Sequence, residues 1–75
     1  MVSDKYSELD NVLDEESWEF LWTNYPPLAL AVQKSVGAGV TPEAIKQRVI
    51  QRLGAHREAL AQRCELAARH LERAK

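Results

Sequence analysis

The side chains best suited to bind a metal or to act as nucleophiles are His56, Cys64 and His70. They fall in a stretch that predicts one continuous helix, in which steps of eight and six residues separate them by about 12 Å and 9 Å along the axis. A zinc ion needs its ligands about 2 Å away, so one helix cannot close this set around a metal. A symmetric dimer that pairs two copies of His56 is the alternative. A histidine partly buried in a helix–helix seam is the simpler interpretation.

The carboxylates near the N-terminus do not form a recognisable catalytic or metal-binding pattern. Asp10, Asp14, Glu15 and Glu16 lack the alternating spacing and the turn glycine of a calcium loop. No serine stands in a pattern with a histidine and an acid, and no glycine-rich phosphate loop is present. Cys64 lies on an apolar helical face, where a thiol behaves as a small hydrophobic side chain. We therefore predict no enzyme, no metal site and no cofactor.

The chain is short for a self-sufficient fold, and its charge is unevenly distributed. A single core in 75 residues buries only about 60% of the unfolded chain's surface, so good helix packing or a partner subunit must add stability. Residues 1–25 carry seven acids and one lysine, whereas residues 26–75 carry nine bases and four acids. This asymmetry favours two halves that attract each other over a basic half that binds nucleic acid.

Neither a targeting segment nor a membrane span is predicted. The N-terminal sequence MVSDKYSELDNVLDEE is acidic and polar, unlike a secretory signal or a transit peptide. The longest apolar run near the middle, PPLALAV, is far too short to span a bilayer. The single cysteine offers no disulfide within one chain and fits a reducing compartment. These features predict a cytoplasmic location.

Capping signals divide the chain into an acidic tail and three helices. Asp14 suits a helix N-cap, and Pro26 ends the first helix because the residue before a proline is disfavoured in the α region. Gly37 suits the end of the second helix, and Thr41 caps the third. The predicted elements are a tail at 1–13 and, in a single domain at 14–75, helices at 14–24, 27–36 and 42–75.

The third predicted helix is far longer than the other two. Gly54 costs about 1 kcal/mol relative to alanine in a helix interior, but its neighbours are good helix formers, so we expect one helix about 50 Å long with a soft point there. The first two helices are too short to cover it. Its apolar residues follow an eleven-residue repeat, which keeps a seam nearly straight. Those residues are Ile45, Val49, Leu53, His56, Leu60, Cys64, Ala67 and Leu71.

The uncovered second half of this helix predicts an association surface. We assign a homodimer seam to its alanine-rich face, and the alternative is that the last two turns fray in water. The seam residues are Leu60, Cys64, Ala67 and Leu71.

The first helix has an apolar face and one aromatic residue that lies off it. Trp18, Leu21, Trp22 and Tyr25 follow helical spacing and predict a core face. Phe20 points another way, flanked by Glu16 and Glu19, and an exposed aromatic side chain beside acids suits a docking point for a partner. The alternative is that a second subunit covers Phe20.

The stretch GAGVTPEAIKQRVIQRLGAH, residues 37–56, resembles a helix-turn-helix DNA reader in its Gly39-Val40-Thr41 turn and in Ile45. It departs from that motif at Arg48, where an apolar residue should pack between the two helices. Glu43 in the first turn of the helix repels phosphate, and the predicted helix is about three times the usual length. A DNA-binding regulator that uses residues 37–52 is therefore the alternative function, behind a protein-interaction module.

Arg48 and Arg52 place two like charges one helical turn apart. One interpretation is a solvated flank, in which the arginine stems shield the core. The other is that they receive the acids of residues 14–19 from the same or a neighbouring chain. With Phe20, Glu16 and Glu19, the two arginines are our predicted partner-binding residues.

Together these patterns predict an all-α domain: two short helices pack on the first half of one long C-terminal helix, which dimerises through its second half. Its predicted role is protein–protein interaction or assembly, as an adaptor, a regulator or the N-terminal association domain of a larger protein. The partners would be a second copy and another protein, with nucleic acid as the alternative and no membrane. Whether the chain continues beyond Lys75 stays open.

We expect no measurable binding of duplex DNA at physiological salt. If Arg48 and Arg52 contacted phosphates, the affinity would fall steeply with salt, with a log–log slope of about −0.9 per contact. Gel-shift titrations over a range of salt concentrations measure this. A complex that survives physiological salt and disappears in the Arg48→Ala, Arg52→Ala double variant would contradict the expectation and favour a DNA-binding regulator.

Overall fold

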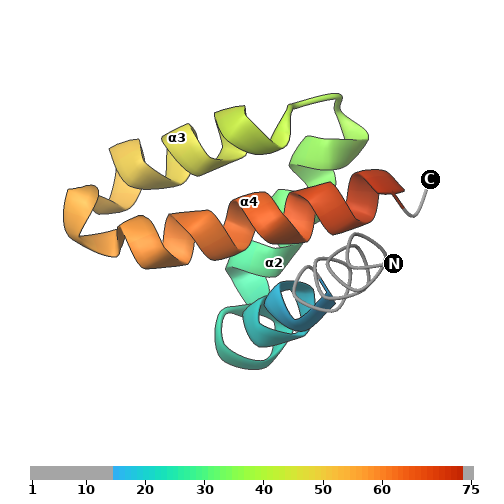
Figure 1. The fold of residues 1–75 in the computed structure, drawn as a ribbon, viewed down its shortest axis with the longest axis horizontal. Coiled ribbons are helices and arrows are strands. Elements are labelled where there is room, and N and C mark those ends of the chain that lie inside the picture. Colours follow the sequence, from blue (N-terminus) through green and yellow to red (C-terminus); the bar gives the residue numbers. More distant parts are fainter. Residues whose placement is uncertain (1–14, 74–75) are drawn as a thin grey trace, which may run out of the picture.

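The computed structural model describes residues 15–73, whose regular structure is all helical (Figure 1). Residues 15–24 form a helical segment. It is followed by α2 (Pro26–Gly37), α3 (Pro42–Leu53), the short 3₁₀ helix η1 (Ala55–Arg57) and α4 (Glu58–Arg73). The predicted all-α class is confirmed for this part of the chain. The predicted tail at 1–13 and the predicted N-cap at Asp14 lie outside the described residues.

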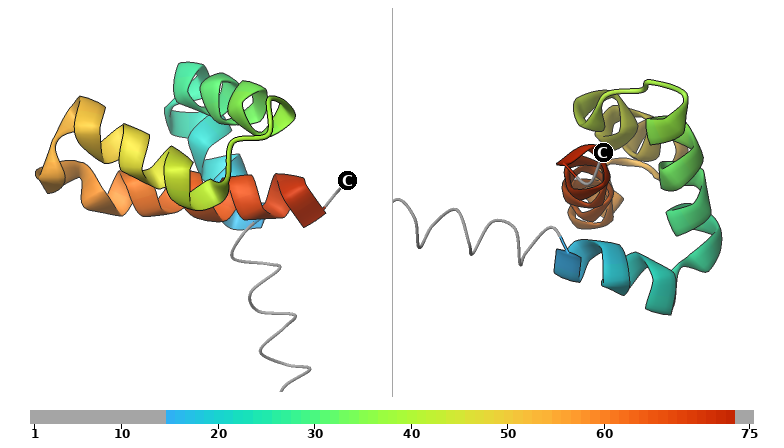
Figure 2. Two further views of the ribbon diagram at one scale, coloured as in Figure 1. Left: turned by 90° about the horizontal axis from the view of Figure 1, so that it is seen from above. Right: turned by 90° about the vertical axis from the view of Figure 1, so that its right-hand side faces the viewer.

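The single helix predicted over residues 42–75 is wrong, because the chain reverses at Gly54. This glycine has φ 91° and ψ 163°, a backbone conformation that is essentially restricted to glycine. Its N–H donates to the carbonyl of Ile50 at 2.8 Å, which closes the last turn of α3. After η1, α4 runs back beside α3, and the two form an antiparallel helical hairpin (Figures 1 and 2).

The near-continuous apolar sequence of residues 28–36 predicts that α2 is the central helix, and this prediction is wrong, because the central helix is α4. Figure 2 shows residues 15–24, α2 and α3 arranged in an arc around α4 when α4 is viewed end-on. The fully buried residues of α4 have small side chains, and small side chains let neighbouring helices pack closely. They are Ala61, Cys64, Ala67 and Ala68. In contrast α2 buries a single face, and its Leu30 is 43% exposed.

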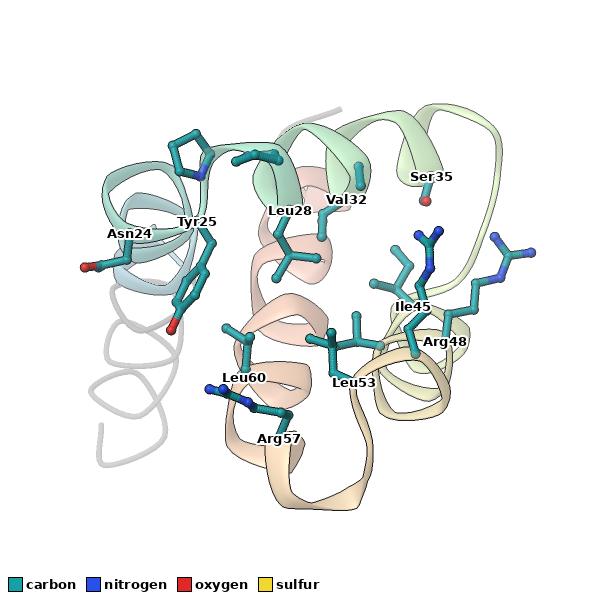
Figure 3. A pocket seen from close by; sticks show the side chains of 15 residues that line it. Asn24, Tyr25, Leu28, Val32, Ser35, Ile45, Arg48, Leu53, Arg57 and Leu60 are labelled. Atoms are coloured by element: carbon teal, nitrogen blue, oxygen red, sulfur yellow. The ribbon is translucent and has the colours of Figure 1, made fainter.

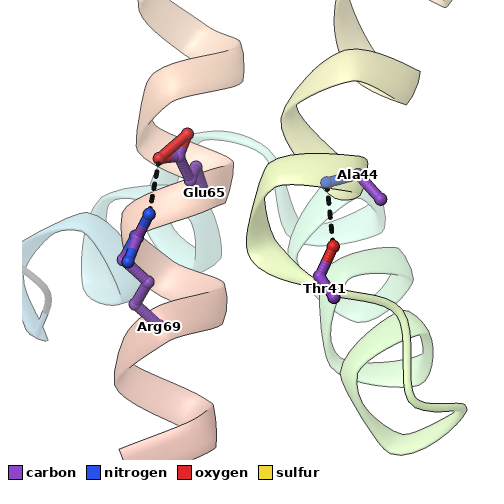
Figure 4. A network of polar contacts seen from close by, with 4 residues as sticks. All are labelled: Thr41, Ala44, Glu65 and Arg69. Carbon is purple, nitrogen blue, oxygen red and sulfur yellow. Dashed lines mark hydrogen bonds and ion pairs between the residues drawn. The ribbon is translucent and has the colours of Figure 1, made fainter.

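The connection between α2 and α3 confirms the predicted cap at Thr41, whereas Gly37, predicted to follow the second helix, is the last residue of α2. Gly39 adopts a positive φ of 88° in the turn. The Thr41 hydroxyl accepts a hydrogen bond from the N–H of Ala44 at 3.2 Å and caps α3 (Figure 4). This start of α3 sets the register that buries Ile45 and Val49 in the core.

The helix that follows the turn, α3, is shorter than the predicted helix at 42–75, and its length bears on DNA binding. It has 12 residues, so the objection that the helix is too long for a DNA reader no longer applies. Glu43 still lies in its first turn. The absence of DNA binding stays a prediction.

The helical segment 15–24 buries a narrower strip than its aromatic residues predicted. Ser17 and Leu21 are fully buried, whereas Trp22 is 40% exposed and Tyr25 is 38% exposed. The segment crosses α4 at a steep angle (Figures 1 and 2), so only its inner side reaches the core, where the partly buried Trp18 packs beside Ser17 and Leu21. The prediction that Trp22 and Tyr25 belong to the core face is wrong for this reason.

The length and hydropathy of the helices in residues 15–73 bear on whether they could cross a membrane. None of the helices in this range combines the length and the apolar character that crossing a membrane demands.

The reversal at Gly54 predicts an unequal response of two glycines to alanine. We expect Gly54→Ala to lower the free energy of unfolding by about 1–3 kcal/mol, the typical cost of a non-glycine residue in such a conformation. The added Cβ would also lie 3.1 Å from ring atoms of His56. Gly37→Ala is the matched control, because its Cβ would meet nothing within 4 Å and its φ is not positive.

Urea-induced unfolding followed by circular dichroism measures both variants. We expect Gly37→Ala to be neutral or stabilising by up to about 1 kcal/mol. Equal stability of Gly54→Ala and the natural chain would contradict the reversal and favour the continuous helix.

Candidate functional site

An open groove lies where α2 leaves the α3–α4 hairpin uncovered (Figure 3). The closed end of the hairpin extends beyond α2 (Figure 1), and the C-terminal end of segment 15–24 borders the groove on another side. We call this depression, of about 760 Å³, the hairpin groove. Its lining residues are Asn24, Tyr25, Pro26, Pro27, Leu28, Ala31, Val32, Ser35, Ile45, Arg48, Val49, Arg52, Leu53, Arg57 and Leu60.

The floor of the hairpin groove is apolar and continuous with the core. Val32 and Ile45 are 2% and 3% exposed, so the deepest part of the groove is the core itself. Leu28, Leu53 and Leu60 come from three different elements and point into the space between them (Figure 3). Leu53 is 42% exposed although it lies within this apolar surface. An exposed apolar patch with a polar rim is typical of a binding site.

The charged residues of the hairpin groove are all arginines. Arg48 and Arg52 come from α3 and Arg57 from η1, and all three side chains are exposed. Among residues 15–73 none of the three forms an ion pair. Arg48 and Arg52 lie one turn apart on α3, and two like charges at this spacing destabilise a helix by about 0.2–0.5 kcal/mol. The groove therefore has a positive rim that the described part of the chain leaves uncompensated.

The residues predicted to bind a partner are divided between two surfaces. Arg48 and Arg52 line the hairpin groove, whereas Glu16, Glu19 and Phe20 lie on segment 15–24 and do not. Within the described chain, Glu16 and Glu19 are exposed and make no ion pair with the two arginines. Pairing of these acids with a neighbouring chain stays a prediction.

Phe20 contributes to the contact between segment 15–24 and α4. The guanidinium of Arg63 lies 5.3 Å from the centroid of the Phe20 ring, and Arg63 also donates a hydrogen bond to the buried Ser17 hydroxyl at 3.3 Å. The Tyr25 ring centroid is 6.0 Å away. Phe20 and Tyr25 are equally exposed, at 38%. The exposure of Phe20 is therefore not distinctive, and its role in docking stays a prediction.

The residues assigned to a homodimer seam are packed within one chain. Cys64 and Ala67 are fully buried, and Leu60 and Leu71 pack against the same core. Because α4 folds back on α3, their burial needs no second subunit, and the reason for placing a seam there is removed. Homodimer formation itself stays a prediction.

The groups considered for metal binding do not lie together. His56 is exposed in η1, and the prediction that it is partly buried in a seam is wrong. Within residues 15–73, no three His, Cys, Asp or Glu side chains are close enough to share a metal ion. Outside the groove, Arg69 pairs with Glu65 at 3.3 Å on the surface of α4 (Figure 4).

Most of the hairpin groove is not predicted from the sequence, which identifies only Arg48 and Arg52 among its lining residues. The sequence predicts no role for Arg57, a core position for Tyr25 and a dimer-seam position for Leu60. A straight helix places Arg57 and Leu60 far from Tyr25, whereas the reversal at Gly54 brings them to one surface. The signal that could have indicated this was Gly54 itself, as a C-terminal stop between two helices of ordinary length.

The buried Cys64 predicts a loss of stability at alkaline pH. Burial removes water from the thiolate and raises the pKa of Cys64 from 9.0 to about 11. The neutral thiol is thus favoured in the folded state, so its contribution to stability is complete below pH 9 and is lost as the pH rises toward 11.

Urea titrations between pH 8 and 11 on the natural chain and on Cys64→Ala measure this contribution. We expect the natural chain to lose more stability than the variant over this range. The variant retains the lysines and tyrosines, which titrate at similar pH, and so isolates the thiol. Parallel pH profiles would contradict the burial of Cys64.

No protein-family model matches the chain, and no curated protein or solved structure does so either. The geometry of the hairpin groove is therefore the basis on which we infer a function.

Proposed function

We propose that this chain is a small protein–protein interaction module and that it binds a segment of another protein in the hairpin groove. The observation that carries the proposal is an open groove, lined by apolar side chains of three helical elements, in which Leu53 is 42% exposed. Grooves between helices that take the apolar face of a partner segment are a recurring mode of protein recognition. An adaptor, a regulator and an association domain of a larger protein all fall within this class.

The energetics of the exposed leucine support the proposal. Burying a leucine side chain completely is worth about 1.5–3 kcal/mol relative to leaving it in water. Leu53 forgoes part of that gain at 42% exposure, and Tyr25, which also lines the groove, is 38% exposed. A partner that covers both side chains gains this burial without requiring a change in the fold.

A pair of leucines with equal exposure allows a matched test. Leu53 is 42% exposed and lines the hairpin groove, whereas Leu30 is 43% exposed and does not line it. We expect Leu53→Glu to abolish binding and Leu30→Glu to preserve it. Both substitutions put a charge on a half-exposed helical position, so they should alter the free energy of unfolding by similar amounts.

The measurement is a selection of peptides from a random display library against the immobilised chain. Enriched peptides are synthesised, and their affinities for the natural chain and for both variants are measured by fluorescence anisotropy. Circular dichroism checks that each variant is folded. A selection without enrichment, or peptides that lose binding equally to both variants, would contradict the proposed function.

A further inference from the structure

The charges around the hairpin groove restrict the partner further than its apolar floor does. The charged lining residues are Arg48, Arg52 and Arg57, with no acidic side chain among them. Elsewhere in the described chain, arginines have partners within their own chain: Arg63 contacts Ser17, and Arg69 pairs with Glu65. The groove thus concentrates positive charge that no described carboxylate compensates, and an anionic partner would compensate it.

The spacing of these arginines defines where the negative charges should lie. Arg48 and Arg52 differ by four residues on α3, so their Cα atoms are about 6 Å apart along its axis. Two carboxylates one turn apart on another helix have the same separation. Figure 3 shows Arg57 on the opposite side of the floor from Arg48, so a segment lying on the floor has arginines along both sides.

The backbone that lines the hairpin groove favours a helical partner. The lining belongs to helices α2, α3 and α4, to η1 and to the end of segment 15–24, and it contains no strand edge to which an extended peptide could add. A helix satisfies its own backbone hydrogen bonds and presents apolar side chains at every third or fourth residue. A nucleic acid would meet the arginines, but its backbone has no apolar side chains to cover Leu53 and Leu60.

We propose that the hairpin groove binds an acidic amphipathic helix of a partner protein. The apolar stripe of this helix covers Leu53 and Leu60. Carboxylates one turn apart on one flank of the stripe pair with Arg48 and Arg52, and a carboxylate on the other flank pairs with Arg57. This inference rests on the proposed function and adds to it the charge and the secondary structure of the partner.

Two synthetic peptides of about 18 residues test the charge. Both carry the same leucine stripe at helical spacing, and their flanks carry glutamates one turn apart in the first peptide and lysines in the second. Anisotropy titrations with the full chain are run at about 50 mM and about 500 mM salt. We expect the glutamate peptide to bind about tenfold more tightly at low salt, with a smaller preference at high salt, because salt screens exposed pairs.

Two charge reversals separate local pairing from overall charge. Arg48→Glu and Lys34→Glu change the net charge equally, but Arg48 lines the groove and the exposed Lys34 does not. We expect Arg48→Glu to remove or invert the preference for the glutamate peptide and Lys34→Glu to retain it. Circular dichroism confirms that both variants are helical.

The outcomes distinguish this inference from the proposed function. If both peptides bind the natural chain with equal affinity and neither binds Leu53→Glu, the inference of an acidic partner is wrong, whereas the proposed interaction module is supported. A loss of preference in Lys34→Glu equal to that in Arg48→Glu would also overturn it.

Other occupants are tested in the same titration. If a peptide of residues 1–19 of this chain binds the groove more tightly than the glutamate peptide, the occupant is a second copy of the chain and the proposal of a partner protein is wrong. If a duplex DNA binds more tightly, the occupant is a nucleic acid and the proposal is also wrong. A display selection that yields no peptide would instead remove the proposed function itself.

Discussion

The backbone conformation of Gly54 is the constraint on which the rest of the structure depends. With φ 91° and ψ 163°, this residue ends α3 and directs the chain into η1, so that α4 returns along α3. The return places the alanine-rich face of α4 against its own neighbours and makes α4 the centre of the fold. It also leaves a closed end that extends past α2 (Figure 1), and the hairpin groove lies beside that end.

The same reversal explains how a chain of 75 residues forms a core without cross-links. Small residues on α4 let three helical elements approach one central helix, and the larger side chains of the other elements fill the space around them. Only part of the available apolar surface is used. Segment 15–24 buries a narrow strip, and its aromatic residues remain partly exposed, as does Leu53 at the end of α3.

Much of the fold follows from local signals in the sequence, and the tertiary arrangement does not. The stop before Pro26, the cap at Thr41 and the start of α3 could be predicted because each depends on residues within one turn. The local signal at Gly54 is ambiguous, because this glycine disfavours a helix whereas its neighbours are good helix formers, and burial of the α4 face decides for the reversal. The candidate site was recovered only in part for the same reason. Arg48 and Arg52 share one helix and were identified together, whereas Arg57 joins them only after the chain has turned back.

The short joint between α3 and α4 also determines which copy of α4 each α3 meets. A short flexible linker holds two segments at an effective concentration of about a millimolar. Two separate chains at micromolar concentration bring the same faces together about a thousand times less often, a difference of about 4 kcal/mol. Packing of α3 against α4 of the same chain is therefore favoured as long as forming the turn at Gly54 costs less free energy than that difference. The short connection at Gly54 thus lets α3 of the same chain cover α4. In a longer, straight helix, a second subunit would have to cover that face.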